Sequence, residues 1–503
     1  MLTLGAGLGA GLAPAFMRHA RAADAPLFTL GVASGQPHAQ GMVLWTRLMA
    51  PVDGPPLPTE VSVQWELAHD EGFTQIAARG SEAARAEDAQ SVHAEPRGLA
   101  PGRGYFYRFS ALGQRSATGR TRTAPAPGDA ATLDFAIASC QRWDHGHFAA
   151  WRHAAEQPLD LVLFLGDYIY EYGNSGAAVR PNASGLVRTL DQYRARYAQY
   201  KADPALQAAH AAAPWLLVWD DHEVENDYAG LQGQSLQAGF AAQRAAAYQA
   251  YWEHLPLPKA ARPVDGELRL FGRLDWGRLA RVHLLDDRQY RDPQVCARLG
   301  RGGSNVVALK DCPDLLNPQR SLLGAAQERW LAEGWDLQRP WNLLAQQTLM
   351  ARFSGTPPED GGGTYWTDGW DGYPAARQRL LATVADRRVP GVVVLGGDVH
   401  AHHVADLKAD FDDPKAPVLA AEFCGTSISS RGPSGDRLAK SLPLNPHMHL
   451  ARGDVRGYVR FQLNAQTLQA QLMAVQDPLQ PDSAVHTLAR CAVDAKRPGV
   501  LKG

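Results

Sequence analysis

The sequence predicts a large α/β (α+β) domain preceded by a small β-sandwich. Residues 27–123 contain short segments that alternate apolar with polar residues between Gly and Pro turns, a pattern typical of immunoglobulin-like or fibronectin-like sandwiches. From residue 132, apolar runs of strand length alternate with stretches of helical pattern, which favours an α/β architecture. We therefore expect two domains, 27–123 and 132–495, joined by the linker-like segment 124–131.

Residues 1–23 are predicted to be the remnant of an export signal peptide. Residues 1–17 are apolar and rich in Gly and Ala, and they lead into a segment with small-residue cleavage sites near Ala22 and Ala23. A first helix of the mature domain is the alternative, although so many glycines make a poor helix. We expect an exported protein, periplasmic or extracellular. No other stretch reaches about 18 uninterrupted apolar residues, so no transmembrane anchor is expected.

The charge balance argues against nucleic acid as a partner. Basic residues number 50 and acidic residues 52, so the formal net charge is −2. No basic run is dense enough to follow a phosphate backbone. The oligomeric state stays open.

The chain has five cysteines, an odd number for an exported protein. Cys140 is the candidate for the free thiol. The most local pairing of the others joins Cys296 to Cys312 and Cys424 to Cys491. The remaining pairings stay open at this point.

Polar residues follow each of the five apolar runs of the large domain. The runs are 133–138, 159–165, 215–219, 281–285 and 391–395. They are followed by Ser139-Cys140-Gln141, Gly166-Asp167-Tyr168-Ile169-Tyr170, Asp220-Asp221-His222-Glu223, Asp286-Asp287-Arg288 and Gly396-Gly397-Asp398-Val399-His400. In open α/β sheets ligands bind outside the carboxyl ends of the strands, so these residues are expected to converge. Because so many ionisable groups in one crevice would repel one another without cations, the sequence predicts a metal site.

Each junction taken alone also has an ordinary explanation. A Gly-Asp pair after a strand commonly forms a turn, His222 fits a buried hydrogen-bonded histidine, and Tyr170 fits simple packing. Asp398 and His400 are two residues apart, so a plain strand would place both on one face. His402 and His403 extend this cluster, and we expect one of them to be solvated or to support a ligand.

Several long segments carry a resemblance to a known family. In order along the chain they are SCQ, FLGDYIYEYG, LLVWDDHEVENDYAG, AAYQAYWEHLP, HLLDDRQYRD, QERWLAEG, LLAQQTLMAR, DGWDGYPAAR and GGDVHAHH. They resemble the PhoD-like alkaline phosphatases, and FTLGVASGQP and VLWTRL resemble the N-terminal domain of that family. The resemblance implies a calcineurin-like metallophosphatase core, similar to that of purple acid phosphatases, with two packed sheets flanked by helices in place of one doubly wound sheet. It implies an enzyme that hydrolyses small-molecule phosphate esters.

The resemblance also implies ligands for two metal ions. Those for Fe³⁺ would be Cys140, Asp167, Tyr170 and Asp398, and those for Ca²⁺ would be Asp167 as a bridge, Asp221 and His400. Carboxylate oxygens suit Ca²⁺, whereas thiolate and phenolate suit iron. Another pair of divalent metals is the alternative, and Asp220 competes with Asp221 as the ligand.

Two further residues are expected to act on the substrate. By analogy with the Gly-Asn-His-Glu turn of metallophosphoesterases, His222 would lie beside the substrate. Some members of the family have arginine where this chain has Glu171, so phosphate needs another cation. Arg288 is a candidate, and its alternative is a salt bridge with Asp286 or Asp287.

The predicted mechanism is in-line attack on phosphorus by a metal-bound hydroxide, with His222 protonating or orienting the leaving oxygen. A phospholipase D-like phosphodiesterase of the same family is one alternative. The other is a non-catalytic, metal-stabilised surface-binding protein. The segment EFCGTSISSRGPSG lacks the G-x-S-x-G pattern of a nucleophile loop, so we interpret it as structural.

Overall fold

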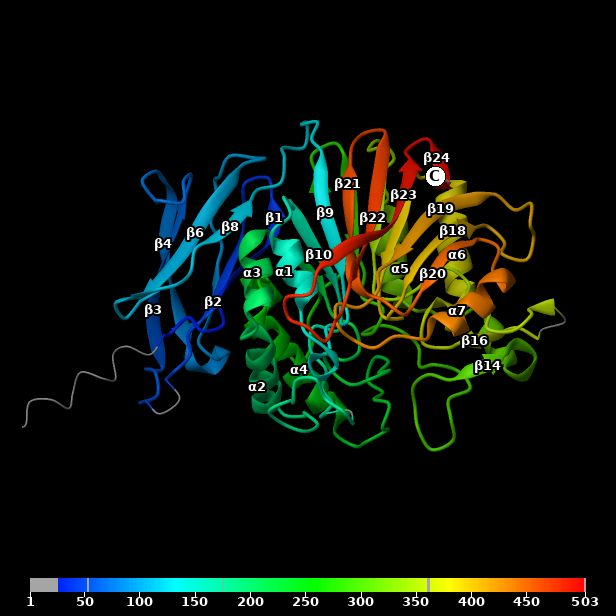
Figure 1. Ribbon diagram of the computed structural model, residues 1–503, viewed down its shortest axis with the longest axis horizontal. Coiled ribbons are helices and arrows are strands. Elements are labelled where there is room, and N and C mark those ends of the chain that lie inside the picture. Colours follow the sequence, from blue (N-terminus) through cyan, green and yellow to red (C-terminus); the bar gives the residue numbers. More distant parts are fainter. Residues whose placement is uncertain (1–25, 52–53, 175, 360–361, 502–503) are drawn as a thin grey trace, which may run out of the picture.

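A computed structural model describes residues 26–501 apart from 52–53, 175 and 360–361. The predicted export signal remnant, residues 1–23, therefore lies outside the described residues. Two large β-sheets pack face to face, helices cover their outer faces, and a third sheet stands at the N-terminal end (Figure 1). This architecture confirms the predicted core of two sheets flanked by helices.

The first large sheet has ten strands and contains three of the five predicted runs. In spatial order the strands are β24 (Arg497–Leu501), β23 (Val485–Asp494), β22 (Thr467–Val475), β21 (Arg456–Leu463), β9 (Leu133–Ala138), β10 (Leu161–Leu165), β11 (Trp215–Val218), β1 (Val32–His38), β2 (Gly41–Arg47) and β5 (Ser91–Ala94). Strands β9, β10 and β11 are parallel, so their carboxyl ends lie at one edge.

The second large sheet has seven strands and contains the other two runs. In spatial order they are β12 (Gly272–Trp276), β13 (Ala280–Leu284), β15 (Trp341–Ala345), β17 (Val392–Gly396), β19 (Val418–Cys424), β18 (His402–Lys408) and β20 (Met448–Arg452). A separate ribbon pairs β14 (Val306–Ala308) with β16 (Thr364–Trp366).

The central strands are buried on both faces. Because successive side chains of a strand point to opposite faces, alternate residues belong to different hydrophobic cores. In β10, Leu161, Leu163 and Leu165 point into the core between the two sheets. Val162 and Phe164 point into the core between the ten-stranded sheet and its helices. Burial on both faces explains why these strands appear in the sequence as unbroken apolar runs.

The helices divide between the two outer faces. Helices α1 (Ala149–Ala155), α2 (Leu190–Lys201), α3 (Pro204–Ala212) and α4 (Phe240–His254) cover the ten-stranded sheet, and α5 (Gly324–Gly334) and α6 (Pro374–Asp386) cover the seven-stranded one. Helix α7 (Gly435–Ser441) lies near β20. Asp203 caps α3 and Pro204 begins it, which separates α2 from α3.

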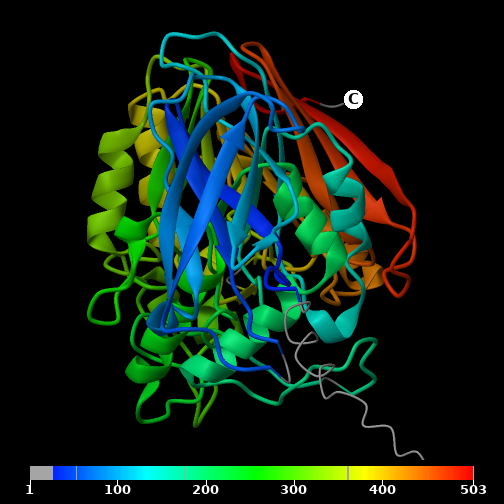
Figure 2. The ribbon, with the colours of Figure 1, turned by 90° about the vertical axis from the view of Figure 1, so that its left-hand side faces the viewer.

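The N-terminal region forms a sheet of β3 (Glu60–Ala68), β4 (Ile76–Arg85), β6 (Gly104–Ala111), β7 (Gln114–Arg115) and β8 (Gly119–Arg122), seen in front in Figure 2. It packs on β1, β2 and β5, which themselves extend the ten-stranded sheet. Strand β1 joins that sheet through Gly35, which pairs with Trp215 of β11. Since the ten-stranded sheet takes strands from both sides of the segment 124–131, the division into two domains stays a prediction.

One of the two predicted disulfides is present. Cys296 and Cys312 are bonded, which confirms the first pair. The pairing of Cys424 with Cys491 is wrong, because both are free thiols. Cys424 ends β19 and belongs to the core beneath α5 and α6, whereas Cys491 in β23 packs against the core between the sheets.

Candidate metal centre

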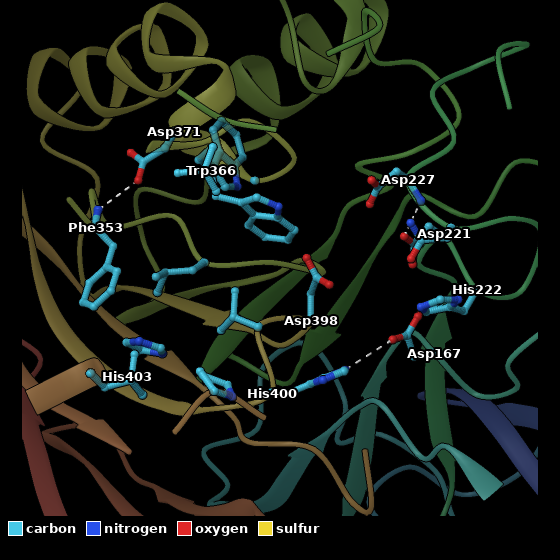
Figure 3. A pocket seen from close by; sticks show the side chains of 18 of the residues that line it. Asp167, Asp221, His222, Asp227, Phe353, Trp366, Asp371, Asp398, His400 and His403 are labelled. Carbon is cyan, nitrogen blue, oxygen red and sulfur yellow. Dashed lines mark hydrogen bonds and ion pairs between the residues drawn. The ribbon is translucent and has the colours of Figure 1, made fainter. Parts of the chain in front are cut away.

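A cavity of about 470 Å³ lies where loops that follow the predicted strands meet. Asp167, Asp221 and His222 reach it from the ten-stranded sheet, and Asp398 and His400 reach it from the seven-stranded sheet (Figure 3). The predicted convergence is therefore observed, although across two sheets and not at the edge of one.

Nine potential ligand side chains form overlapping groups around this cavity. Within each group the ligand atoms lie within 4.8 Å of one another. The groups are Cys140 with Asp167 and His400; Asp167 with Asp221 and His222; Asp167 with Asp220 and Asp398; and Asp221 with Asp227 and Asp368. Asp167 belongs to three of these groups, so its carboxylate is in a position to bridge two cations.

The hydroxyl of Tyr170 belongs to the same cluster. It donates a hydrogen bond to Asp167 Oδ2 at 2.6 Å and lies 3.1 Å from His400 Nε2. The Ser430 hydroxyl donates to the Tyr170 oxygen at 2.8 Å. Ser430 belongs to the segment interpreted as structural, and its bond holds the phenol ring against the predicted ligands.

The residues of this centre fit bound cations. Asp167 Oδ1, Asp220 Oδ2 and Asp221 Oδ1 are buried oxygens without a hydrogen-bond partner among the described residues. Burial raises the pKa of the Cys140 thiol well above its usual value, and neighbouring carboxylates raise it further. Burial likewise raises the pKa of Asp398, although Arg288 opposes this rise. Positive charge in the cluster would satisfy the orphaned oxygens and favour the ionised forms.

The backbone is strained at four of the predicted ligands. Cys140, Asp167, Asp398 and His400 have φ angles of 59°, 60°, 64° and 53°, in the left-handed region that ordinary residues seldom adopt. Strand β17 ends at Gly396, so the expectation that a plain strand holds both Asp398 and His400 is wrong. Both side chains reach the cavity from the following loop.

Neither of the neighbouring histidines is solvated. His402 is fully buried in β18, where its Nδ1 accepts a hydrogen bond from the Thr426 backbone. His403 is also buried, but it lines the cavity and packs edge-on against Phe353, with ring centres 5.3 Å apart.

Arg288 is buried behind the ligands and is not among the residues that line the cavity. Its guanidinium pairs with Asp220, and with Asp368 at 2.6 Å and Asp398 at 3.5 Å. The suggested ion pair with Asp286 or Asp287 is not the one observed. Arg288 follows β13 of the seven-stranded sheet, whereas Asp220 follows β11 of the ten-stranded sheet, so this ion pair joins the two sheets.

His222 has a carboxylate partner that fixes its orientation. Glu171 is fully buried and its Oε2 lies 2.7 Å from His222 Nδ1, while its Oε1 accepts the Asn226 N–H. Burial lowers the pKa of His222, but Glu171, Asp221 and Asp167 together raise it well above its usual value. His222 therefore faces the cavity as an imidazole that favours the protonated form.

Glu223 organises the backbone of the site, a role that the sequence analysis missed. Its carboxylate accepts the N–H groups of Asp167 at 3.1 Å, Tyr168 at 2.6 Å and Asp220 at 2.9 Å. These bonds join the loops after β10 and β11. The acidic residue was visible in the sequence, but two of its three backbone partners, Asp167 and Tyr168, lie more than 50 residues away.

Replacing Glu223 by Ala should lower the free energy of unfolding by about 3 kcal/mol or more, because each buried donor left without an acceptor costs about 1–3 kcal/mol. Chemical denaturation followed by tryptophan fluorescence measures this change. The control, Glu156→Ala, removes an exposed carboxylate at the end of α1 and should change stability by less than about 0.5 kcal/mol. Equal stability of the two variants would contradict the role of Glu223.

Asp227 and Asp368 were also missed as members of the cluster. The Asp227 N–H donates to Asp221 Oδ2 at 2.6 Å, and Asp368 accepts from Arg291 at 2.8 Å. Both lie in segments that carry the family resemblance, VWDDHEVENDYAG and DGWDGYPAAR. Their position in these segments was the feature of the sequence that could have indicated both residues as members of the cluster.

The fold and the site together define a metallophosphatase-like protein. In structure the chain is similar to a purple acid phosphatase, PPD1 from yellow lupin (Lupinus luteus) seeds, with a TM-score of 0.58 and 11% identity over 92% of this chain and 74% of that one. At this identity the likeness supports the fold alone.

A family model described as PhoD-like phosphatase matches residues 135–472, and its N-terminal domain model matches residues 11–125. The chain belongs to the PhoD-like phosphatase family. It is 42% identical to alkaline phosphatase D of Bacillus subtilis (strain 168) over 94% of this chain and 82% of that protein. A solved structure of PhoD matches with a TM-score of 0.89 and 40% identity, covering 94% of this chain and 91% of the other.

Membership of this family confirms the prediction of an enzyme that hydrolyses phosphate esters. Among the described residues, no helix is both long enough and apolar enough to cross a membrane.

Proposed function

We propose that this protein is an exported, metal-dependent alkaline phosphatase or phosphodiesterase with Fe³⁺ and Ca²⁺ as cofactors. The position of Asp167 carries the proposal, because one buried carboxylate shared by three ligand groups suits a centre with more than one cation. Export is proposed from the signal-like residues 1–23.

Iron would be held by Cys140, Asp167, Tyr170 and Asp398, since thiolate and phenolate favour it. Calcium would be held by Asp167, Asp221 and His400. We favour Asp221 over Asp220 because Asp221 lines the cavity and lies 3.9 Å from Arg288, whereas Asp220 does not line the cavity and contacts Arg288 more closely. His400 Nε2 lies 3.9 Å from Asp167 Oδ2, so these two side chains could hold the same ion. The alternative is another pair of divalent metals.

The bound cations would convert water to the attacking hydroxide and neutralise charge on the phosphoryl oxygens. His222, held by Glu171, would donate a proton to the leaving oxygen, a contribution of about 10²–10⁴-fold in general acid catalysis. Arg288 is better placed as a positioning residue than as a substrate contact, because it holds Asp220 and Asp398 from behind.

Removing the metals with a chelator should abolish hydrolysis of 4-nitrophenyl phosphate and of bis(4-nitrophenyl) phosphate, and adding metals back should restore it. Elemental analysis of the purified protein before and after chelation identifies the ions. Chelated protein that keeps full activity would contradict a metal-dependent mechanism.

The same two substrates distinguish an alkaline phosphatase from the alternative, a phospholipase D-like phosphodiesterase. That enzyme should hydrolyse the diester at least about 10²-fold faster than the monoester, whereas an alkaline phosphatase of broad specificity should hydrolyse both. The cavity beside the predicted ligands leaves room for the second ester group of a diester, and this observation favours a diester substrate.

A further inference from the structure

One wall of the cavity carries none of the nine potential metal ligands. At about 470 Å³ the cavity is within the range of about 300–1,000 Å³ found for pockets that enclose a whole small organic molecule. The metal ligands occupy one side. The rest of the lining includes the apolar side chains Val306, Leu349, Phe353, Trp366 and Leu438, together with the polar side chains Asp371, His403 and Arg437.

This apolar wall is built by elements that hold it in place. Val306 of β14 and Trp366 of β16 are direct partners in the two-stranded ribbon. The disulfide between Cys296 and Cys312 closes the loop that contains β14. Phe353 is fixed by its N–H, which donates to Asp371 at 2.9 Å.

The ribbon is also tied to the metal centre. Ser304, two residues before β14, donates to Asp227 Oδ2 from its backbone at 2.8 Å and from its hydroxyl at 2.7 Å. The Asp227 N–H in turn donates to Asp221. The wall therefore has a defined position relative to the phosphoryl group that the centre would bind.

The wall and the proposed proton donor lie in different directions from the centre. Figure 3 shows His222 on one side of Asp398 and His400, and Phe353 with His403 on the other. The leaving oxygen must reach His222, so the leaving group cannot also occupy the wall. An organic group that rests on the wall must be one that stays attached to phosphorus.

We propose that Val306, Phe353 and Trp366 form a specificity-determining subsite for the retained ester group of a phosphodiester, and that this group is aromatic or otherwise apolar. The proposal rests on the proposed function. Val306 is 49% exposed and Trp366 is half-buried, so both offer apolar surface that a substrate group could cover. Stacking on an aromatic ring and burial of apolar surface supply the binding energy.

Three substrates with one leaving group test the subsite: 4-nitrophenyl phosphate, methyl 4-nitrophenyl phosphate and phenyl 4-nitrophenyl phosphate. The metal-replete full chain should show a KM for the phenyl diester at least about fivefold below that for the methyl diester. Trp366→Ala should lower kcat/KM for the phenyl diester about tenfold, mainly through KM. Its kcat/KM for the methyl diester and the monoester should change less than about threefold.

Two further variants keep the test decisive. Val306→Asp places a charge at an exposed position of the wall, where folding should tolerate it, and should weaken phenyl diester binding selectively. Trp330→Ala removes a half-buried tryptophan of α5 outside the cavity and should leave all three activities near wild type.

Equal losses on all three substrates in Trp366→Ala and Val306→Asp, or equal KM values for the two diesters in the wild type, would overturn the subsite while leaving the proposed function intact. If the metal-replete wild type hydrolyses none of the three substrates, the proposed function fails, and the subsite fails with it.

Discussion

Replacing Asp167 by Asn should lower kcat/KM by about 10²–10³-fold or more, the scale on which catalytic electrostatic contacts are lost. The amide keeps the size of the side chain but removes the negative charge that three ligand groups share. Asp398→Asn and His400→Ala should each cost more than about 10²-fold for the same reason. Steady-state kinetics on 4-nitrophenyl phosphate, with the metal content of each variant measured in parallel, check these values.

The matched control is Asp386→Asn, which neutralises an exposed carboxylate at the end of α6. It should keep activity and metal content within about twofold of the wild type, as expected for a surface change. Near-normal turnover of Asp398→Asn or His400→Ala would remove these residues from the metal centre.

The Tyr170→Phe variant should lose the visible colour that a ferric phenolate gives through ligand-to-metal charge transfer. The change keeps the ring and its packing but deletes the oxygen that contacts Asp167 and His400. Absorption spectra of wild type and variant, with thermal unfolding as a check on the fold, measure the effect. A site with only Ca²⁺, Mg²⁺ or Zn²⁺ would have no such band.

A calcium chelator distinguishes the two proposed ions. It should remove activity before colour, because carboxylate-held Ca²⁺ exchanges more readily than thiolate-held iron. A colourless, iron-free and fully active enzyme would contradict the assignment of iron. It would leave a phosphoesterase with an ordinary divalent pair, in which Cys140 is a buried thiol.

The sequence anticipated most of the cluster, because the predicted ligands follow apolar runs that are strands in the structure. Four of them occupy the left-handed region, which no residue pattern indicated. Strand β4 does not follow the alternating pattern seen elsewhere in residues 27–123, since its Ala-rich sequence IAARGSEAAR lacks apolar alternation. Strands with regular apolar alternation could be recognised in the sequence, whereas a strand without it could not.

The sequence by itself determined the family and indicated the candidate residues of the site, because residue types and their order along the chain are local properties. Only the tertiary structure decided which groups meet. Arg288 pairs with carboxylates from three other loops, Glu223 binds two loops together, and Cys424 is kept from Cys491 by the packing of two sheets. These contacts join residues that are distant in the chain, and they arise because burying both faces of two sheets brings their loops to one end.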